Sequence, residues 1–270
     1  SPSEFPLFIL TSVLISVAVV PLLLSAGSPP KYQESVNISL LAVYRLSPLG
    51  IVSMFSVGLV TAAFFALGPV YGQRMGLNVE YISYFMTAAV VGTVILQAPI
   101  GVLSDRFDRR IVLTITTLLT SVAAVLCVFA SQISTNLLLL AVAIFGGLAL
   151  PLYSVCIAYT NDHLNPNQMI AASGALVLTS GLGAVVGPIL IASFMDHFGE
   201  QAMFWVIAAI HALTGLFALY RMTVSRAVPL DKQGPYTSTA VHPSGSAIES
   251  VQQYNRAEAI DDSTQAKIQR

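Results

Sequence analysis

Charged side chains are scarce in this chain of 270 residues, which holds 12 lysines and arginines and 13 aspartates and glutamates, or 9% of the total. Soluble globular proteins carry about 25%. The formal net charge of -1 also excludes a strong basic field for nucleic acid, so we expect no nucleic-acid partner. Hydrophobic residues make up 55% of the sequence. This composition predicts a protein whose solvent is a lipid bilayer.

Cysteine is equally scarce, and Cys127 and Cys156 both lie in apolar stretches where a thiol acts as a small hydrophobic group. The apolar stretches contain no cluster of metal-binding side chains and no activated serine or cysteine, so we expect no metal, no cofactor and no enzyme activity. They also lack Asp, Glu, Lys and Arg. Any proton coupling would therefore depend on His211 or on a group outside this chain.

Seven apolar stretches have about the 20 residues that a helix needs to cross a hydrocarbon core of about 30 Å. They cover approximately residues 5–26, 49–70, 82–103, 111–130, 137–159, 169–195 and 204–220. We therefore predict an all-α polytopic membrane bundle of about seven transmembrane helices in the inner or plasma membrane. No basic leader precedes the first stretch, which predicts a true span rather than a signal peptide. The chain begins with Ser1, so we expect further sequence upstream.

One polar turn, from Gly101 to Arg110, holds five charged residues between two of these stretches. Its pattern, Gly-x-Leu-x-Asp-Arg-x-x-Arg-Arg, resembles the signature loop of the major facilitator superfamily of secondary transporters, whose consensus is Gly-x-Leu-Ala-Asp-Arg-x-Gly-Arg-Arg/Lys-x-x-Leu. Leu113 matches the final leucine, whereas Asp108 replaces the consensus glycine. The resemblance covers about residues 5–222 and is closest to a poorly characterised bacterial branch. It implies transport of a small molecule by alternating access, by an efflux or uptake permease.

Members of this family have two six-helix halves, with the signature loop after helix two and a weaker copy after helix eight. If this loop is the second copy, the seven stretches are helices six to twelve. If it is the first, the chain is an N-terminal half with an extra leading helix. We favour the second copy, because residues 137–159 lack the arginine that helix four carries in many proton-coupled members. Gly183-x-x-x-Gly187-Pro188 favours the first, since it resembles a motif best known from helix five of exporters.

This register predicts four parts of the chain. They are residues 1–26 as the last helix of the N-terminal bundle, 27–47 as a cytoplasmic interdomain loop with a short interfacial helix, 48–222 as the C-terminal six-helix bundle, and 223–270 as a disordered cytoplasmic tail. We expect the interfacial helix from Val36 to Leu46, with Asn37 as its N-cap. The partners are the bilayer, a small-molecule substrate and the missing N-terminal bundle of the same transporter.

Lysine and arginine predict the orientation, because they concentrate in cytoplasmic loops. If the turn from Gly101 to Arg110 lies in the cytoplasm, eleven of the twelve basic residues fall on that side. Arg74 alone lies outside. The polar tail is then cytoplasmic as well.

The signature loop is expected to form a cytoplasmic gating latch. The resemblance implies that its acidic residue, Asp105, faces a helix N-terminus of the opposite bundle while the cytoplasmic side is closed. Asp162 is a nearby acid that can pair with Arg106 or Arg109. The alternative is that these charges only mark topology in a solvated turn. The residues assigned to the latch are Gly101, Asp105, Arg106, Arg109, Arg110 and Asp162.

Glycine and proline indicate where helices pack closely or bend. Gly183, Gly187 and Pro188 combine small residues four apart with a proline that removes a backbone donor, and Pro151 follows a glycine pair in another stretch. Such helices often line the substrate path of transporters, although plain helix packing explains the same residues.

Four uncharged polar residues are candidates for the substrate pathway: Thr61, Gln97, Tyr153 and Ser180. The resemblance places them on helices that contribute to the central cavity, whereas His211 falls on a peripheral helix. Serine and threonine can instead bond to their own helix. A second class of function stays open, in which the protein is a non-transporting membrane sensor or scaffold that retains the fold.

Overall fold

The computed structural model describes residues 5–24, 39–165, 168–224 and 233–234, and these ranges form α-helices and no β-strand. The predicted all-α class is confirmed. The chain divides into two units, residues 1–33 and 34–270, and each is treated by itself. The helices are α1 (Phe5–Leu24), α2 (Leu40–Leu46), α3 (Pro48–Arg74), α4 (Val79–Arg106), α5 (Arg109–Ile133), α6 (Thr135–Ala149), α7 (Leu152–Asn161), α8 (Met169–Phe198) and α9 (Ala202–Val224).

Six stretches in the described residues are long and apolar enough to cross a bilayer, and α1 adds a shorter apolar stretch. Five of the six are the single helices α3, α4, α5, α8 and α9. The sixth, Thr135–Asn161, combines α6 and α7, which are separated only by Leu150 and Pro151. The predicted polytopic bundle is confirmed, and the glycine pair followed by Pro151 coincides with an interruption of the helix.

Polar N-cap residues mark where apolar helices begin, and a glycine marks where α8 ends. Asn78 caps α4 by accepting a hydrogen bond from the Tyr81 N–H at 2.9 Å, and Ser134 caps α6 through the Leu137 N–H at 3.2 Å. Gly199 follows α8 with a φ of 83°, a conformation that strains any residue with a Cβ. These caps fix short connections, so consecutive long helices run antiparallel.

The short helix before the bundle differs in one detail from the sequence expectation. α2 begins at Leu40, and its N-cap is Ser39, whose hydroxyl accepts from the Ala42 N–H at 3.2 Å. Asn37, the predicted cap, lies outside the described residues. Both residue types cap well, so only the position of the first helical turn distinguishes them. The predicted tail also lies outside, except for Thr223 and Val224, which belong to the end of α9, and the pair Gln233 and Gly234.

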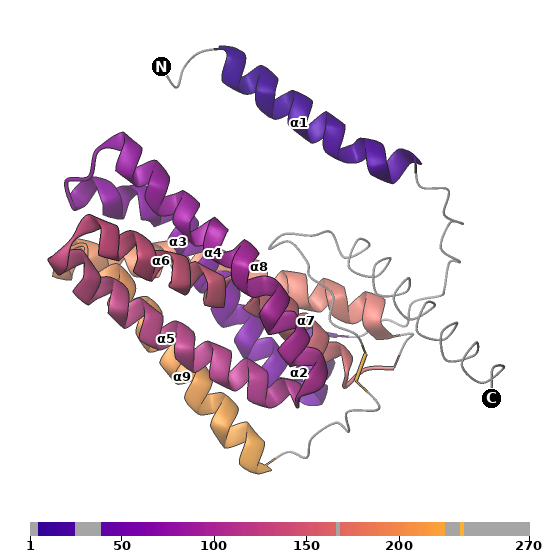
Figure 1. Ribbon diagram of the computed structural model, residues 1–270. Helices are drawn as coiled ribbons and strands as arrows, with labels where there is room; N and C mark the ends of the chain where they lie inside the picture. The colour runs from indigo at the N-terminus through magenta and orange to yellow at the C-terminus, as the bar shows by residue number, and fades with distance from the viewer. Residues whose placement is uncertain (1–4, 25–38, 166–167, 225–232, 235–270) are drawn as a thin grey trace. The chain divides into compact units, whose positions relative to one another are not determined.

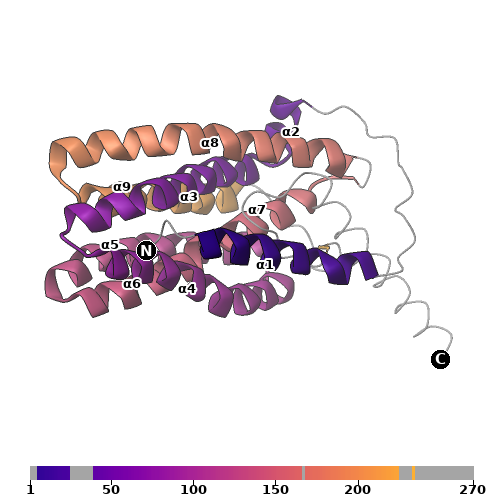
Figure 2. The same cartoon turned by 90° about the horizontal axis from the view of Figure 1, so that it is seen from above.

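Small residues bring the long helices into backbone contact. α3 packs along α8, and a Cβ on Gly58, Gly183 or Gly187 would overlap main-chain atoms of the other helix. α4 packs along α6 in the same manner at Gly92 and Gly146. α5 packs against both α6 and α9, and Figures 1 and 2 show α5 and α9 side by side. α8 runs unbroken through Pro188. The predicted tight packing of Gly183 and Gly187 is therefore a feature of the α3–α8 interface.

The bundle has two polar ends and an apolar interior. Asp105, Asp162 and α2 lie at one end, which we call the Asp105 end. Arg74 and Asp196 lie at the other, the Arg74 end, where they form an ion pair of 2.6 Å. An aromatic cluster of Phe64, Tyr71, Phe85, Phe145 and Phe204 fills the interior toward the Arg74 end, with ring centroids 5.1 to 6.4 Å apart. The packed interior therefore fixes the positions of the helix ends that form the Asp105 end.

Candidate functional site

The side chain of Arg109 is the centre of the Asp105 end. It is 2% exposed and is the largest fully buried side chain of the described residues. Its Nε donates to the Ser104 hydroxyl at 3.2 Å. Its Nη1 donates to both carboxylate oxygens of Asp162 at 2.8 Å and to the Ala158 carbonyl at 3.4 Å. Its Nη2 donates to Asp105 at 2.9 Å and to the Gly234 carbonyl. All three guanidinium nitrogens therefore have acceptors, as burial of a cation requires.

Asp162 is the buried carboxylate partner of this cation, because its side chain is only 4% exposed, whereas that of Asp105 is 43% exposed. Burial raises the pKa of the Asp162 carboxyl, since a charged group is poorly solvated there. Arg109 and the Gly234 N–H, which donates at 3.1 Å, lower the pKa and partly offset that effect. Asp162 and Arg109 thus form a buried ion pair between the end of α7 and the start of α5.

The helix dipoles oppose both members of this pair. Arg109 is the first residue of α5, where the dipole favours negative charge, and Asp162 is the C-cap of α7, where it favours positive charge. Local helix electrostatics therefore do not explain either residue. Their mutual attraction does, and it joins α5 to α7 across 53 positions of sequence.

Most of the signature loop lies inside helices rather than in a turn. Gly101, Asp105 and Arg106 belong to the last turns of α4, and only Phe107 and Asp108 separate α4 from α5. Asp108 caps α5 by accepting from the Arg110 N–H at 2.9 Å, and its carboxylate pairs with the Arg110 guanidinium at 2.9 Å. Its φ is -54°, so the turn needs no glycine. The departure from the consensus glycine is thus accommodated by capping.

The latch residues of the sequence analysis gather here in part. Asp105 and Asp162 both bind Arg109, and Arg110 pairs with Asp108. Asp105 remains 43% exposed, so one acid of the cluster faces outward while the other is buried. Arg106 is exposed at the end of α4.

Two participants were missed by the sequence analysis. Ser104 is fully buried and holds the Nε of Arg109, at the position where the consensus has alanine. A hydroxyl in place of a methyl was the available signal. Gly234 binds both Asp162 and Arg109, but it lies in a polar segment with no motif that predicts a binding role.

The four pathway candidates do not converge on an open cavity among the described residues. Thr61, Tyr153 and Ser180 are at most 4% exposed and are packed within the bundle. Gln97 is half-buried on α4. In this conformation three of the four contact packed neighbours, so their role in a pathway stays a prediction.

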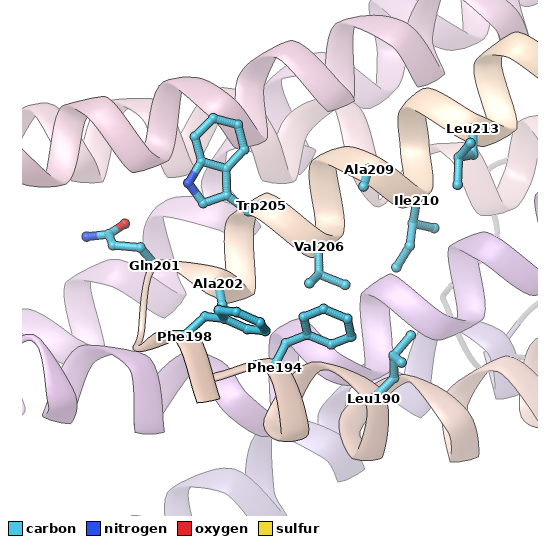
Figure 3. Close-up of a pocket in the computed structure, with 10 residues that line it drawn as sticks. All are labelled: Leu190, Phe194, Phe198, Gln201, Ala202, Trp205, Val206, Ala209, Ile210 and Leu213. Atoms are coloured by element: carbon cyan, nitrogen blue, oxygen red, sulfur yellow. The ribbon is translucent and has the colours of Figure 1, made fainter. Parts of the chain in front are cut away.

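A separate apolar groove of about 640 Å³ lies between α8 and α9. Figure 3 shows Val206 and Ile210 of α9 pointing toward Phe194 and Leu190 of α8. Leu213, which also lines the groove, is 67% exposed, and Trp205 is 48% exposed. The groove therefore opens on the outer surface of the bundle, and none of the pathway candidates lines it.

The fold and its charged ends define a polytopic, all-helical membrane protein. Residues 49–252 match the family model of the Major Facilitator Superfamily. The chain belongs to this family.

Relatives in bacteria carry transporter names rather than enzyme names. The uncharacterized MFS-type transporter YcaD of Escherichia fergusonii is 24% identical over 201 residues, which cover 74% of this chain and 51% of that protein. A similarly named transporter of Enterobacter sp. (strain 638) is 25% identical over 219 residues, covering 80% and 56%. YcaD of Escherichia coli O139:H28 is 25% identical over 199 residues, covering 73% and 51%. The chain spans about half the length of these curated relatives.

Proposed function

We propose that this chain is the C-terminal bundle of a secondary active transporter that moves a small molecule across the inner membrane by alternating access. The observation that carries the proposal is the match to the family over residues 49–252, together with coverage of about half of each relative. We assign the remaining half to a second bundle and place it before residue 48, because residues 137–159 lack the arginine that helix four carries in many proton-coupled members.

Two helices offer faces on which that second bundle can pack. Only 22% of the residues in the α4 span and 39% of those in the α8 span are buried, against half or more in the other four spans. Their exposed apolar residues recur at helical spacing, so each forms a continuous stripe. The stripes are Val90, Val91, Val94 and Ile95 on α4, and Leu182, Val185, Val186 and Ile189 on α8.

The Arg109 cluster is the gating latch of this proposal, and the Asp105 end faces the cytoplasm. Arg109 binds Asp105, and the Asp105 side chain remains 43% exposed, so a helix end of the opposite bundle can reach it. Closing the cytoplasmic side adds that contact, and opening inward removes it. The buried pair with Asp162 keeps Arg109 in place in both states, because leaving either charge alone in the interior is costly.

The interior favours a small, weakly polar or amphipathic substrate. The buried polar groups of the described spans are almost all hydroxyls, including Thr61 and Ser180, and the charged groups lie at the two ends. Gln97, Thr61, Tyr153 and Ser180 are the residues that we assign to its path. A multiply charged substrate would find no countercharge there.

Uptake into proteoliposomes tests the proposal. A panel of radiolabelled weakly polar and amphipathic compounds is offered to vesicles that hold the chain alone, or the chain with the first half of one of the matched transporters. We expect flux above empty vesicles only with both halves, and its loss in Arg109→Ala. Flux through the chain alone would contradict the two-bundle proposal. A protein with both halves that binds compounds without moving them would instead favour a sensor.

A further inference from the structure

The main chain of Gly234 meets the Arg109 cluster with both of its polar groups. The Gly234 N–H donates to Asp162 Oδ1 at 3.1 Å, and the Gly234 carbonyl accepts from Arg109 Nη2. This residue lies ten positions after the end of α9, and 72 and 125 positions from its two partners. The contact therefore places Gly234, a residue of the polar tail, against Arg109 and Asp162.

The cluster is built to accept such a segment. Asp162 and Arg109 place a buried acceptor next to a buried donor, and a peptide unit presents the complementary N–H and C=O. Without Gly234, one Asp162 lone pair and one Arg109 N–H would lose their partner in a site where those side chains are 4% and 2% exposed. Charge-assisted bonds of this kind are about twice as strong as neutral ones.

The residue after Gly234 keeps this position out of a helix. It is Pro235. Proline disfavours the α conformation of the residue before it, which keeps Gly234 from extending a helix. The main-chain groups of Gly234 are then available to other partners.

We propose that Arg109 and Asp162 form a binding site for peptide main chain, and that the protein's own tail occupies it through Gly234. When Gly234 occupies the site, it fixes the guanidinium of Arg109 in the position in which it binds Asp105. A helix end of the opposite bundle would then contact Asp105 in a signature loop whose conformation is already fixed. Docking of the tail is independent of transport; only its effect on gating rests on the proposed function.

Hydrogen exchange of the full chain in lipid nanodiscs tests docking directly. We expect the Gly234 amide to exchange about tenfold more slowly than in unfolded protein, which is the order of effect of one charge-assisted hydrogen bond. Asp162→Ala should remove this protection, whereas Asp196→Ala, which removes an exposed acid at the other end, should leave it unchanged. Equal exchange in wild type and folded Asp162→Ala protein would overturn the proposal.

Trypsin gives a second test in which the bundle is untouched. The Lys232–Gln233 bond lies next to the docked residue, and the Arg256–Ala257 bond serves as a reference in the same tail. Gly234→Pro removes the N–H that Asp162 accepts, and Gly234→Ala keeps it. Each cleavage rate is divided by the rate for the same variant in denaturant.

Tail docking predicts that cleavage after Lys232 is about tenfold slower than after Arg256 in wild type and Gly234→Ala, and that Gly234→Pro abolishes the difference. Equal normalised rates in all three proteins would overturn docking. If docking is observed but complete transporters show no flux, the transport proposal fails while the binding site stands.

Discussion

Removal of the Asp162 carboxylate should cost far more stability than removal of an exposed acid. In Asp162→Ala the guanidinium of Arg109 stays buried, and Asp105, whose side chain is 43% exposed, is the one charged partner that it keeps among the described residues. Breaking a buried ion pair by deleting one member typically costs about 3–5 kcal/mol. Since Asp105 still compensates part of the charge, we expect about 3 kcal/mol.

The exposed pair at the other end is the matched control. Arg74 and Asp196 are 2.6 Å apart, closer than Arg109 and Asp162, but their side chains are 41% and 61% exposed. Asp196→Ala should therefore cost only about 0–1 kcal/mol. The free energy of unfolding is measured by SDS titration in mixed micelles and followed by far-UV circular dichroism. Equal costs for the two variants would refute the reasoning that burial, rather than distance, decides the effect.

Three further predictions use the same assay. Burial raises the pKa of the Asp162 carboxyl and outweighs the lowering by Arg109, so the stability linked to its proton is fully present below about pH 4 and is lost as the pH rises through the raised value; Asp162→Asn should flatten that decline. Gly183→Leu should cost about 1–3 kcal/mol because its Cβ would overlap the α3 main chain, whereas Gly181→Leu, with nothing within 4 Å of a Cβ, should cost less than about 0.5 kcal/mol. Ser56→Ala and Thr214→Val remove a 2.8 Å hydrogen bond between α3 and α9, and their double-mutant cycle should give a coupling of about 0.6 kcal/mol; a value near zero would contradict a direct bond.

The sequence was sufficient to predict the membrane spans, because a span is recognised by the length of its apolar stretch. A run of about 20 residues without charge predicts a span because the bilayer fixes the length, and six such runs are helices that satisfy this test. The charge pattern of the signature loop also led to the pairing of Asp162 with an arginine of that loop, since two opposite charges near helix ends in an apolar protein attract each other.

The sequence was insufficient where the outcome depends on orientation or on single contacts. Helices such as α3 and α8 are apolar on every side, so their pattern cannot show that Thr61 and Ser180 turn inward. The cap of α2 depended on whether Ser39 or Asn37 precedes the first turn. Gly234 binds through its main chain, which every residue possesses, and such a contact leaves no pattern in the sequence.

Thiol labelling from each side of the membrane tests most directly whether the Asp105 end is the cytoplasmic latch of a transporter bundle. Cys127 and Cys156 are buried and are replaced by alanine, and single cysteines are placed at exposed positions: Gln132 at the Arg74 end, and Phe107 and Asn165 at the Asp105 end. An impermeant reagent should label Gln132→Cys in intact cells, and Phe107→Cys and Asn165→Cys only in inside-out vesicles. Labelling of Phe107→Cys in intact cells would contradict the orientation and, with it, the latch.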